Sequence, residues 1–419
     1  MVGSMPVRPH SPTAVRRRGS KGKIAFLTHS AKLSGAEIAL ANIVPWLTND
    51  VDVVVMLGED GPLADALRVR GVDVIIVDSL RALSQLRREG GFVSVLQSSS
   101  GIVRMVWRHA VLFRRLRVDV VETGSMKSHV YGGIAAILVG RPLILRLHDR
   151  VDERYFARVF ARTMRFWCAV VPDLVVANSQ SSASTLLPST RVRVVPPAVP
   201  AVGVGQRVDG IDHDLHFGCI GRIAPWKGQA ELIEAFAGAF RGGGERLVIC
   251  GAPLFGEDAY FESIKLLAVE LGVADQVQFL GFVQDVGSVL GSLDVLVHSS
   301  ILPEPFGQVV IEGMSAGLAV VAADSGGPAE NIEHGVNGLL YATGNVEELR
   351  RCLELVASAD DLRTRIGAAG PLQAARFQPE AVVPTLLDCY RLVQGTRGSL
   401  RVLRRLSRTL IASFRPLRR

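Results

Sequence analysis

Short runs of β-branched and other apolar residues alternate with longer amphipathic segments along most of the chain, starting at Lys23. Strand-length apolar runs separated by segments of helical periodicity are typical of repeated βα units, whose parallel strands are covered by helices. The pattern therefore predicts the α/β class. Composition agrees, because 42 glycines and only 6% aromatic residues suit many tight strand-to-helix turns better than a β-sandwich.

The alternation occurs in two series, which predict two domains in a chain of 419 residues. Between the series, residues 196–210 are rich in Pro, Gly and Val without a regular period, as expected of a linker. Two Rossmann-like doubly wound domains in tandem would face each other across a cleft, with ligands at the carboxyl ends of the strands. The candidate strands are 23–28, 51–57, 72–77, 119–122, 143–147, 174–177 and 191–195, then 216–220, 246–250, 276–280, 295–298 and 319–322.

These signals predict six consecutive parts of the chain. They are a basic disordered segment at 1–22, a first Rossmann-like domain at 23–195, a linker at 196–214, a second Rossmann-like domain at 215–378, a C-terminal helix at 379–395 and a basic amphipathic tail at 396–419.

Charge is distributed unevenly between the ends and the body of the chain. Residues 1–23 hold six basic groups, residues 397–419 hold eight, and neither segment has an acidic one. Because the whole chain has a formal charge of +7, residues 24–396 have a net charge of −7. The basic character belongs to the ends, which argues against nucleic-acid binding by the folded domains.

Cysteine usage and hydropathy indicate a chain of the cytoplasm. The five cysteines are scattered without metal-ligand spacing and are odd in number, which fits a reducing compartment. The first twenty residues have arginines but no apolar core of a signal peptide. The longest apolar run, at 130–139, is shorter than the ~20 residues that a membrane-spanning helix needs.

Glu304 and Glu312 flank a turn that follows a candidate strand, in the sequence PEPFGQVVIEG. The segment Phe306-Gly307-Gln308 leads into a predicted helix, whose free N–H groups and dipole favour an anion. Carboxylates accept hydrogen bonds from hydroxyls and repel phosphate, so the two glutamates suit sugar or ribose hydroxyls. A nucleotide sugar offers both kinds of partner. The alternative is that Glu304 is solvated and Glu312 caps its helix.

Two cations stand at the carboxyl end of the first strand of the second series. Arg222 and Lys227 lie within Gly221-Arg222-Ile223-Ala224-Pro225-Trp226-Lys227-Gly228. Side-chain cations there can neutralise a diphosphate and stabilise the charge that grows on it as a leaving group, in place of a metal ion. Each residue taken alone would be expected as a solvated loop cation.

These two segments resemble the family 4 glycosyltransferases, a large retaining group with the GT-B fold. The GRxxxxKG pattern stands at 221–228 and the ExxxxxxxE pattern at 304–312, within a resemblance that covers residues 23 to about 395. The resemblance implies that Arg222 and Lys227 hold the donor diphosphate. It also implies that Glu304 contacts the transferred sugar, that Glu312 contacts the ribose, and that the backbone of residues 306–308 meets sugar and phosphate.

Two features of the first series match the same family. His148 ends a strand in LRLHDR, where the resemblance implies a histidine near the sugar and the reacting centre. Ser34-Gly35-Ala36-Glu37 resembles the family's GGxE loop, with Ser34 in place of the first glycine. Gly35 still permits close approach of the backbone to phosphate or acceptor. A structural hydrogen-bonding role is the alternative for His148.

The resemblance implies a metal-independent hexosyltransferase that uses a UDP- or GDP-linked sugar as co-substrate and a lipid-linked or glycan acceptor on the first domain. Two alternatives remain open, a nucleotide-sugar epimerase of similar fold and a non-catalytic protein that binds sugar nucleotides. Asp212-His213-Asp214 matches a metal-carrying DxD pattern but precedes a strand, so we interpret it as solvated linker.

The C-terminal tail has the pattern of an interfacial helix. From Leu400 on, the apolar and basic residues fall on opposite sides of a helical wheel, as expected of a helix lying on an anionic membrane. We therefore expect a cytoplasmic protein that contacts the inner face of the membrane, with a disordered tail as the alternative. The two sides are Leu400, Leu403, Leu406, Leu410 and Phe414 against Arg401, Arg404, Arg405 and Arg408.

Overall fold

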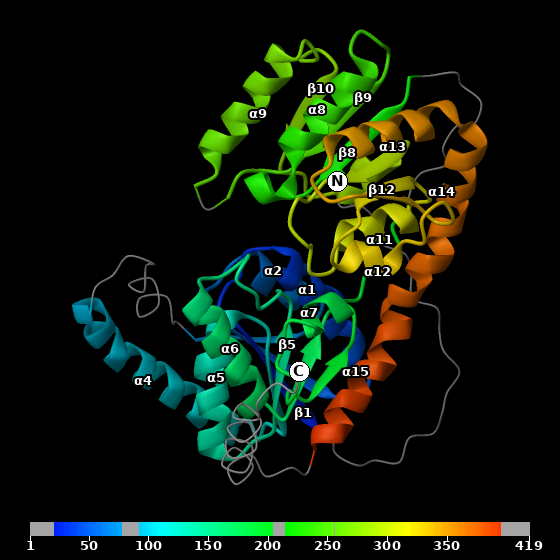
Figure 1. Ribbon diagram of the computed structural model, residues 1–419. Helices are drawn as coiled ribbons and strands as arrows, with labels where there is room; N and C mark the ends of the chain where they lie inside the picture. The colour runs from blue at the N-terminus through cyan, green and yellow to red at the C-terminus, as the bar shows by residue number, and fades with distance from the viewer. Residues whose placement is uncertain (1–20, 78–91, 204–213, 255, 395–419) are drawn as a thin grey trace, which may run out of the picture.

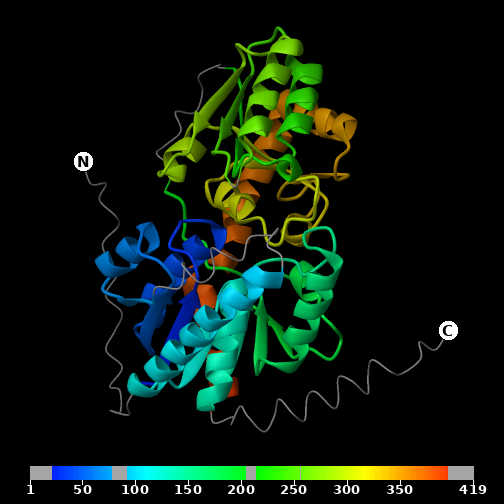
Figure 2. The same ribbon diagram turned by 90° about the vertical axis from the view of Figure 1, so that its left-hand side faces the viewer.

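The computed structural model describes residues 21–77, 92–203, 214–254 and 256–394, with side chains described from residue 101 onward in the helix that begins at Phe92. The described residues form two lobes, each a parallel sheet covered by helices (Figures 1 and 2). The predicted tail at 396–419, residues 1–20 of the basic segment and Asp212 and His213 of the DxD pattern lie outside the described residues.

The first lobe is built on a sheet with the strand order β3-β2-β1-β4-β5-β6-β7. Adjacent strands all pair in parallel, and the order reverses direction between β1 and β4. The strands are β1 (Lys23–Thr28), β2 (Asp52–Leu57), β3 (Asp73–Ile76), β4 (Val120–Thr123), β5 (Leu143–Leu147), β6 (Leu174–Ala177) and β7 (Val192–Val194). The helices are α1 (Gly35–Leu47), α2 (Pro62–Val69), α4 (Phe92–Arg115), α5 (Met126–Val139), α6 (Arg158–Val170) and α7 (Gln180–Ala183).

The second lobe repeats this arrangement with the strand order β10-β9-β8-β11-β12-β13. Here the order reverses between β8 and β11. The strands are β8 (His216–Ile220), β9 (Arg246–Cys250), β10 (Val277–Gly281), β11 (Val295–His298), β12 (Ala319–Ala323) and β13 (Leu339–Tyr341). The helices are η1 (Pro225–Lys227), α8 (Gln229–Phe240), α9 (Asp258–Glu270), α10 (Val286–Gly291), α11 (Gln308–Ser315), α12 (Gly327–Asn331), α13 (Val346–Ser358), α14 (Asp360–Ala374), η2 (Ala375–Phe377) and α15 (Pro379–Val393).

Strand alternation explains the layered core. In β1, Ile24 and Phe26 belong to the apolar cluster under α1, α2 and α15, whereas Ala25 and Leu27 belong to the cluster under α4 and α5. Successive side chains of a strand point to opposite faces, so a strand covered on both faces is apolar throughout. This is why the candidate strands appear as continuous apolar runs rather than as alternating ones.

The last helix returns from the second lobe to the first. Val382, Leu386 and Tyr390 of α15 are buried in the same cluster as α1, and Figure 1 shows the orange and red helices running along both lobes. The linker makes the other crossing, where the Val199 amide donates to the Phe377 carbonyl at 2.8 Å. The two lobes are therefore joined by two antiparallel passages of the chain.

The structure confirms the predicted α/β class with two facing Rossmann-like sheets. All twelve candidate strands are present, and each end lies within one residue of its predicted position. The sequence analysis missed β13, a strand of only three residues that pairs with β12. No described helix combines the length and the apolar content needed to cross a membrane.

Gly228 joins the loop that follows β8 to helix α8, and we expect that this position does not tolerate a side chain. It has φ +70°, and a Cβ there would lie 2.0 Å from the Ser299 carbonyl oxygen. Gly228→Ala should lower the melting temperature by several degrees, because it adds a backbone collision to the left-handed strain of ~1–2 kcal/mol. Differential scanning calorimetry measures the effect.

Gly272→Ala is the matched control. Gly272 has the same φ of +70°, but its added Cβ would meet only the Arg241 side chain, at 3.6 Å. A melting temperature equally lowered in both variants would show that the close approach at Ser299 is unimportant.

Candidate functional site

Residues after β8 and β11 meet because these two strands are neighbours at the point where the strand order reverses. The loop after β8 carries Arg222 and Lys227, and the loop after β11 carries Glu304. In open parallel sheets this reversal leaves a crevice at the carboxyl ends of the strands. The topology therefore brings together the two motifs that the sequence analysis singled out separately.

Trp226 supports both cations of the first motif. The Arg222 guanidinium lies 5.5 Å from the centre of the indole ring, and the Lys227 ammonium lies 4.5 Å from it. Both separations are within the range of cation–π attraction. The indole ring therefore helps to hold both cationic side chains in place at the carboxyl end of β8.

Glu304 is the centre of the hydrogen-bonded cluster. Its Oε2 lies 2.6 Å from Lys227 Nζ and accepts a hydrogen bond from Ser300 Oγ at 3.1 Å. His298 Nε2 lies 3.5 Å from the same oxygen. The side chains of Lys227 and Glu304 are 16% and 15% exposed, so this is a largely desolvated ion pair. Sequence analysis expected these two residues to serve different ligand groups, and the structure pairs them with each other.

Burial by itself raises the pKa of the Glu304 carboxyl, but Lys227 and then His298 outweigh that effect. The net result is a pKa far below the usual range for glutamate. Glu304 is therefore an anion throughout the physiological pH range, suited to accept hydrogen bonds from hydroxyl groups rather than to supply a proton.

The second glutamate occupies a different place. Glu312 lies in the second turn of α11, where it accepts a hydrogen bond from Gln308 Nε2 at 2.8 Å, so the alternative that it caps its helix is wrong. Burial raises the pKa of its carboxyl, and the bond from Gln308 opposes that shift. Gly307, with φ +78°, precedes the first turn of α11. The Phe306 ring is buried against Phe377 and is therefore not available to a ligand.

Gly35 opens α1, at the carboxyl end of β1 in the first lobe. A Cβ at Gly35 would meet nothing within 4 Å. Ser34 makes no side-chain cap to the backbone and instead donates its hydroxyl to Glu37, which also accepts a hydrogen bond from Thr28 Oγ1 at 3.2 Å. The serine at the first glycine position of the GGxE-like loop therefore fixes the glutamate that ends the motif.

His148 follows β5 and is half-buried. Burial, aided by the Arg146 guanidinium, lowers the pKa of its imidazole to about 3. The ring is therefore neutral at physiological pH and can donate or accept a hydrogen bond without adding charge. Its backbone carbonyl accepts a hydrogen bond from Asn178 Nδ2 at 2.8 Å.

Asp149 connects the charges of the two lobes. Asp149 is exposed, but the protein around it removes part of the water from its carboxyl, which raises the pKa of that group to about 6. Repulsion by Glu37 and Glu304 acts in the same direction, and Arg222 opposes it. These interactions mean that residues from both lobes share one electrostatic environment.

Direct contacts between the lobes surround Glu304. The Tyr155 hydroxyl donates to the carbonyl of Pro303, and the Ser179 hydroxyl donates to the carbonyl of Pro305 at 2.5 Å. The Tyr155 ring also packs edge-on against Trp226, with 6.2 Å between ring centres. Tyr155 and Ser179 were missed by the sequence analysis, because nothing in their local sequence indicates which backbone they meet across the cleft.

Glu330 makes a further contact between the lobes. Its carboxylate accepts hydrogen bonds from the amides of Gln180 and Ser181, at 2.9 and 2.5 Å, in the first turn of α7. An anion at a helix N-terminus is favoured by the free N–H groups there. These bonds place the second lobe against the first on the α7 side of the cleft.

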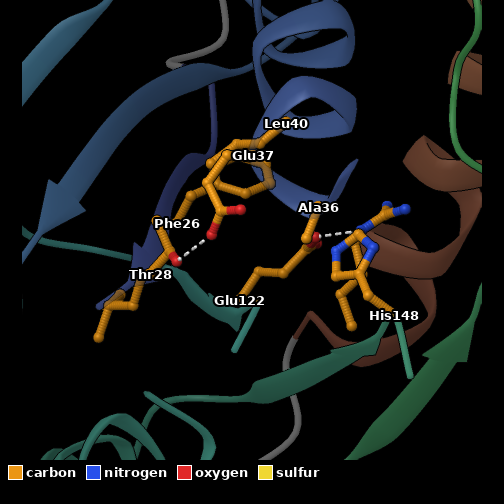
Figure 3. A pocket seen from close by; sticks show the side chains of 10 residues that line it. Phe26, Thr28, Ala36, Glu37, Leu40, Glu122 and His148 are labelled. Carbon is orange, nitrogen blue, oxygen red and sulfur yellow. Dashed lines mark hydrogen bonds and ion pairs between the residues drawn. The ribbon is translucent and has the colours of Figure 1, made fainter. Parts of the chain in front are cut away.

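A pocket lies at the corresponding reversal point of the first sheet (Figure 3). Its lining comes from β1, α1, β4 and β5, and His148 stands at one side. Within the described residues, no group of three or more His, Cys, Asp or Glu side chains is arranged to hold a metal ion.

Two family models match this chain, one in each lobe. The model of glycosyl transferases group 1 matches residues 209–373, and the model of glycosyltransferase family 4 matches residues 62–201. The first contains Arg222, Lys227, Glu304 and Glu312, and the second contains His148.

Curated relatives are similar over shorter stretches. The lipopolysaccharide core biosynthesis glycosyltransferase LpsE of Rhizobium meliloti is 33% identical over 170 residues, which is 40% of this chain and 47% of that protein. The D-inositol 3-phosphate glycosyltransferase of Corynebacterium jeikeium is 28% identical over 249 residues, which is 54% of this chain and 59% of that protein. The chain thus spans about half the length of the curated relatives it matches.

A solved structure is similar over nearly the whole described chain. HepE from Anabaena, determined in complex with UDP and glucose, has a TM-score of 0.76 and 26% sequence identity, and the match covers 88% of this chain and 99% of that one. With family models in both lobes and a shared two-sheet architecture, the chain belongs to the family 4 glycosyltransferases of the GT-B fold.

Proposed function

We infer that this glycosyltransferase moves a hexose, with retention of configuration and without a metal ion, from a nucleotide diphosphate sugar to a lipid-linked or glycan acceptor. The observation that carries the proposal is the desolvated Lys227–Glu304 pair beside Arg222 on the Trp226 ring. It combines cations suited to a diphosphate with a carboxylate suited to sugar hydroxyls. HepE, which binds UDP and glucose in its structures, supports a UDP-linked sugar as the first donor to test.

In this proposal the cations stabilise the leaving group. The bond between the sugar and the diphosphate breaks, and its electron pair stays with the diphosphate. The acceptor hydroxyl oxygen bonds to the sugar, and the proton of that hydroxyl passes to the departing diphosphate oxygen. Arg222 and Lys227 offset the charge that develops on the diphosphate. An ammonium has three N–H groups, so Lys227 can hold Glu304 and a phosphate oxygen at once.

The remaining predicted site residues have proposed roles around the donor. Glu304 accepts hydrogen bonds from hydroxyls of the transferred sugar, and Glu312 from the ribose. The backbone at Gly307 and Gln308 approaches phosphate, beside the first turn of α11. His148 serves as a neutral hydrogen-bonding group near the reacting centre, on the acceptor side.

Lys227→Ala and Glu304→Gln are expected to reduce sugar transfer by about 10²–10³-fold, as removal of one transition-state contact usually does. Transfer should continue in excess EDTA, because the stabilising cations are side chains.

The donor is first chosen from UDP-, GDP- and ADP-sugars by thermal shift, where a ligand at a hundred times its dissociation constant adds ~2.7 kcal/mol of stability. Release of nucleotide with and without a glycan acceptor then measures transfer.

Lys265→Ala is the matched control, because this lysine makes its ion pair with Glu262 on the surface of α9. Turnover of donor to an isomer without any acceptor would indicate an epimerase. Near-native transfer by Lys227→Ala would remove that residue from the site, and magnesium-dependent recovery after EDTA would contradict metal independence.

Tyr155→Phe is expected to lower kcat about tenfold while donor affinity stays nearly unchanged. The hydroxyl crosses the cleft to the backbone that holds Glu304, so its loss should disturb the closed geometry more than the donor contacts of the second lobe. Steady-state kinetics and a nucleotide titration separate the two effects.

Tyr260→Phe serves as the control, because its hydroxyl is bonded to Gln229 and Ala230 inside the second lobe. An unchanged kcat in Tyr155→Phe, or equal losses in both variants, would count against a role for this contact in closure.

We also propose that the protein acts in the cytoplasm at the inner face of the membrane. The tail pattern, whose residues lie outside the described structure, motivates this proposal, and α4 supplies a second basic surface. Val103, Arg104, Trp107 and Arg108 form an exposed face of α4, where Trp107 is 64% exposed. Exposed apolar side chains among arginines suit an anionic lipid surface.

Truncation after Gly395 is expected to release the protein from phosphatidylglycerol vesicles, because it removes eight arginines worth ~1 kcal/mol each near such a surface. Sedimentation at low and high salt measures binding, which should weaken as salt rises. Equal binding of the full and truncated chains would reject the tail as the anchor. Trp107→Ser then tests the α4 face.

A further inference from the structure

The first turn of α7 takes two of its hydrogen bonds from the opposite lobe. The amides of Gln180 and Ser181 donate to the Glu330 carboxylate on α12, which lies beside α7 where the lobes meet (Figure 1). The next amide, that of Ser182, donates to the Ser179 hydroxyl oxygen at 2.9 Å. The first N–H groups of a helix have no acceptor within it, and a helix of four residues gains little stability from its own bonds. Glu330 therefore stabilises this turn only while the lobes are in contact.

The same turn holds the backbone around His148. The Asn178 side chain, just before the turn, donates to the His148 carbonyl at 2.8 Å. Arg150 donates from Nη1 to the Ser181 carbonyl at 2.7 Å, and the Arg150 side chain is 15% exposed. The start of α7 and the segment after β5 are thus linked at two points. A shift of α7 would therefore displace the segment that carries His148.

A second set of contacts links the turn to Glu304. The Ser179 hydroxyl donates to the carbonyl of Pro305, the residue after Glu304. The Gly327 amide at the start of α12 donates to the Glu304 carbonyl at 2.8 Å. Because Glu330 lies on the same short helix as Gly327, the contacts close on themselves. They form a ring that runs from Glu304 through α12 and the start of α7 back to Pro305.

This ring of contacts connects the two sides of the cleft. Glu330 is exposed, so water competes for its hydrogen bonds and the contact can open and form again as substrates enter and leave. We propose that Glu330 is a positioning residue for sugar transfer, which holds the start of α7 and thereby sets the separation between His148 and Glu304. The assignment rests on the proposed function, since it takes these two residues to lie around one reacting centre.

Glu330→Ala is expected to lower kcat about tenfold and to leave the dissociation constant of the donor nucleotide within twofold. The proposed nucleotide contacts lie inside the second lobe, whereas the placement of His148 depends on the ring. Glu330→Gln keeps an oxygen that can accept from one of the two amides, so it should recover part of the lost kcat. Steady-state kinetics and a titration with UDP, or with the nucleotide of another donor that thermal shift selects, measure the two quantities.

Glu333→Ala is the matched control. Glu333 is exposed on the same lobe, and its backbone hydrogen bonds are made to nearby residues of that lobe. Its kcat should equal that of the unsubstituted protein.

Amide hydrogen exchange gives a readout that does not depend on catalysis. In the full ligand-free chain, mass spectrometry should show about tenfold faster exchange at residues 180 and 181 in Glu330→Ala, because these amides lose their acceptor. Glu333→Ala should exchange at the unsubstituted rate. If the unsubstituted protein transferred no sugar from any donor, the proposed function would fail, and the exchange rates would still decide whether Glu330 holds α7.

A double-mutant cycle tests whether the contacts act as one ring. Ser179→Ala and Glu330→Ala should together lower kcat little more than the more damaging single change, since both release the same turn, whereas independent effects multiply. Multiplying losses, an unchanged kcat in Glu330→Ala, equal losses of kcat and nucleotide affinity, or unchanged exchange at α7 would each overturn the proposal.

Discussion

The segment from Pro303 to Pro305 is the point on which the arrangement of the cleft depends. The side-chain carboxylate of Glu304 accepts a hydrogen bond from Lys227. The backbone carbonyl of Glu304 accepts a hydrogen bond from the Gly327 amide at 2.8 Å. The first lobe holds the two flanking carbonyls through Tyr155 and Ser179. This short turn of the second lobe therefore contacts both the loop that carries Arg222 and Lys227 and the first lobe. The Glu304 charge tolerates its burial because Lys227 and two polar side chains compensate for lost water.

The two sheets use their strand-order reversals in different ways. In the second lobe the reversal brings Lys227 and Glu304 together as a paired set of charges. In the first lobe the neighbouring strands β4 and β5 carry the buried ion pair of Glu122 and Arg146. The Tyr390 hydroxyl of α15 donates a hydrogen bond to the same Glu122 carboxylate. The α15 helix thus does more than cover apolar surface, since Tyr390 also donates a hydrogen bond to the buried Glu122.

The elements with strong local signals were predictable. Fully apolar strands are recognised from short stretches of sequence, because burial on both faces requires apolar residues throughout. The loop from Gly221 to Gly228 is recognised in the same way, from the spacing of its glycines and cations. The three-residue strand β13 has too little sequence to show a period. The contacts of Tyr155, Ser179 and Glu330 were beyond prediction because each joins residues more than a hundred positions apart.

The sequence alone determined the α/β class, two tandem sheets and the two motifs that identify the family, because these depend on periodicity and on residue spacing within a few turns. Only the tertiary structure decided that Lys227 pairs with Glu304, that Tyr155 and Ser179 hold the flanking carbonyls, and that Arg146 is buried against Glu122. The physical reason is that hydrogen bonds and ion pairs depend on separations of about 3 Å, which strand order and lobe closure set and which sequence distance does not reveal.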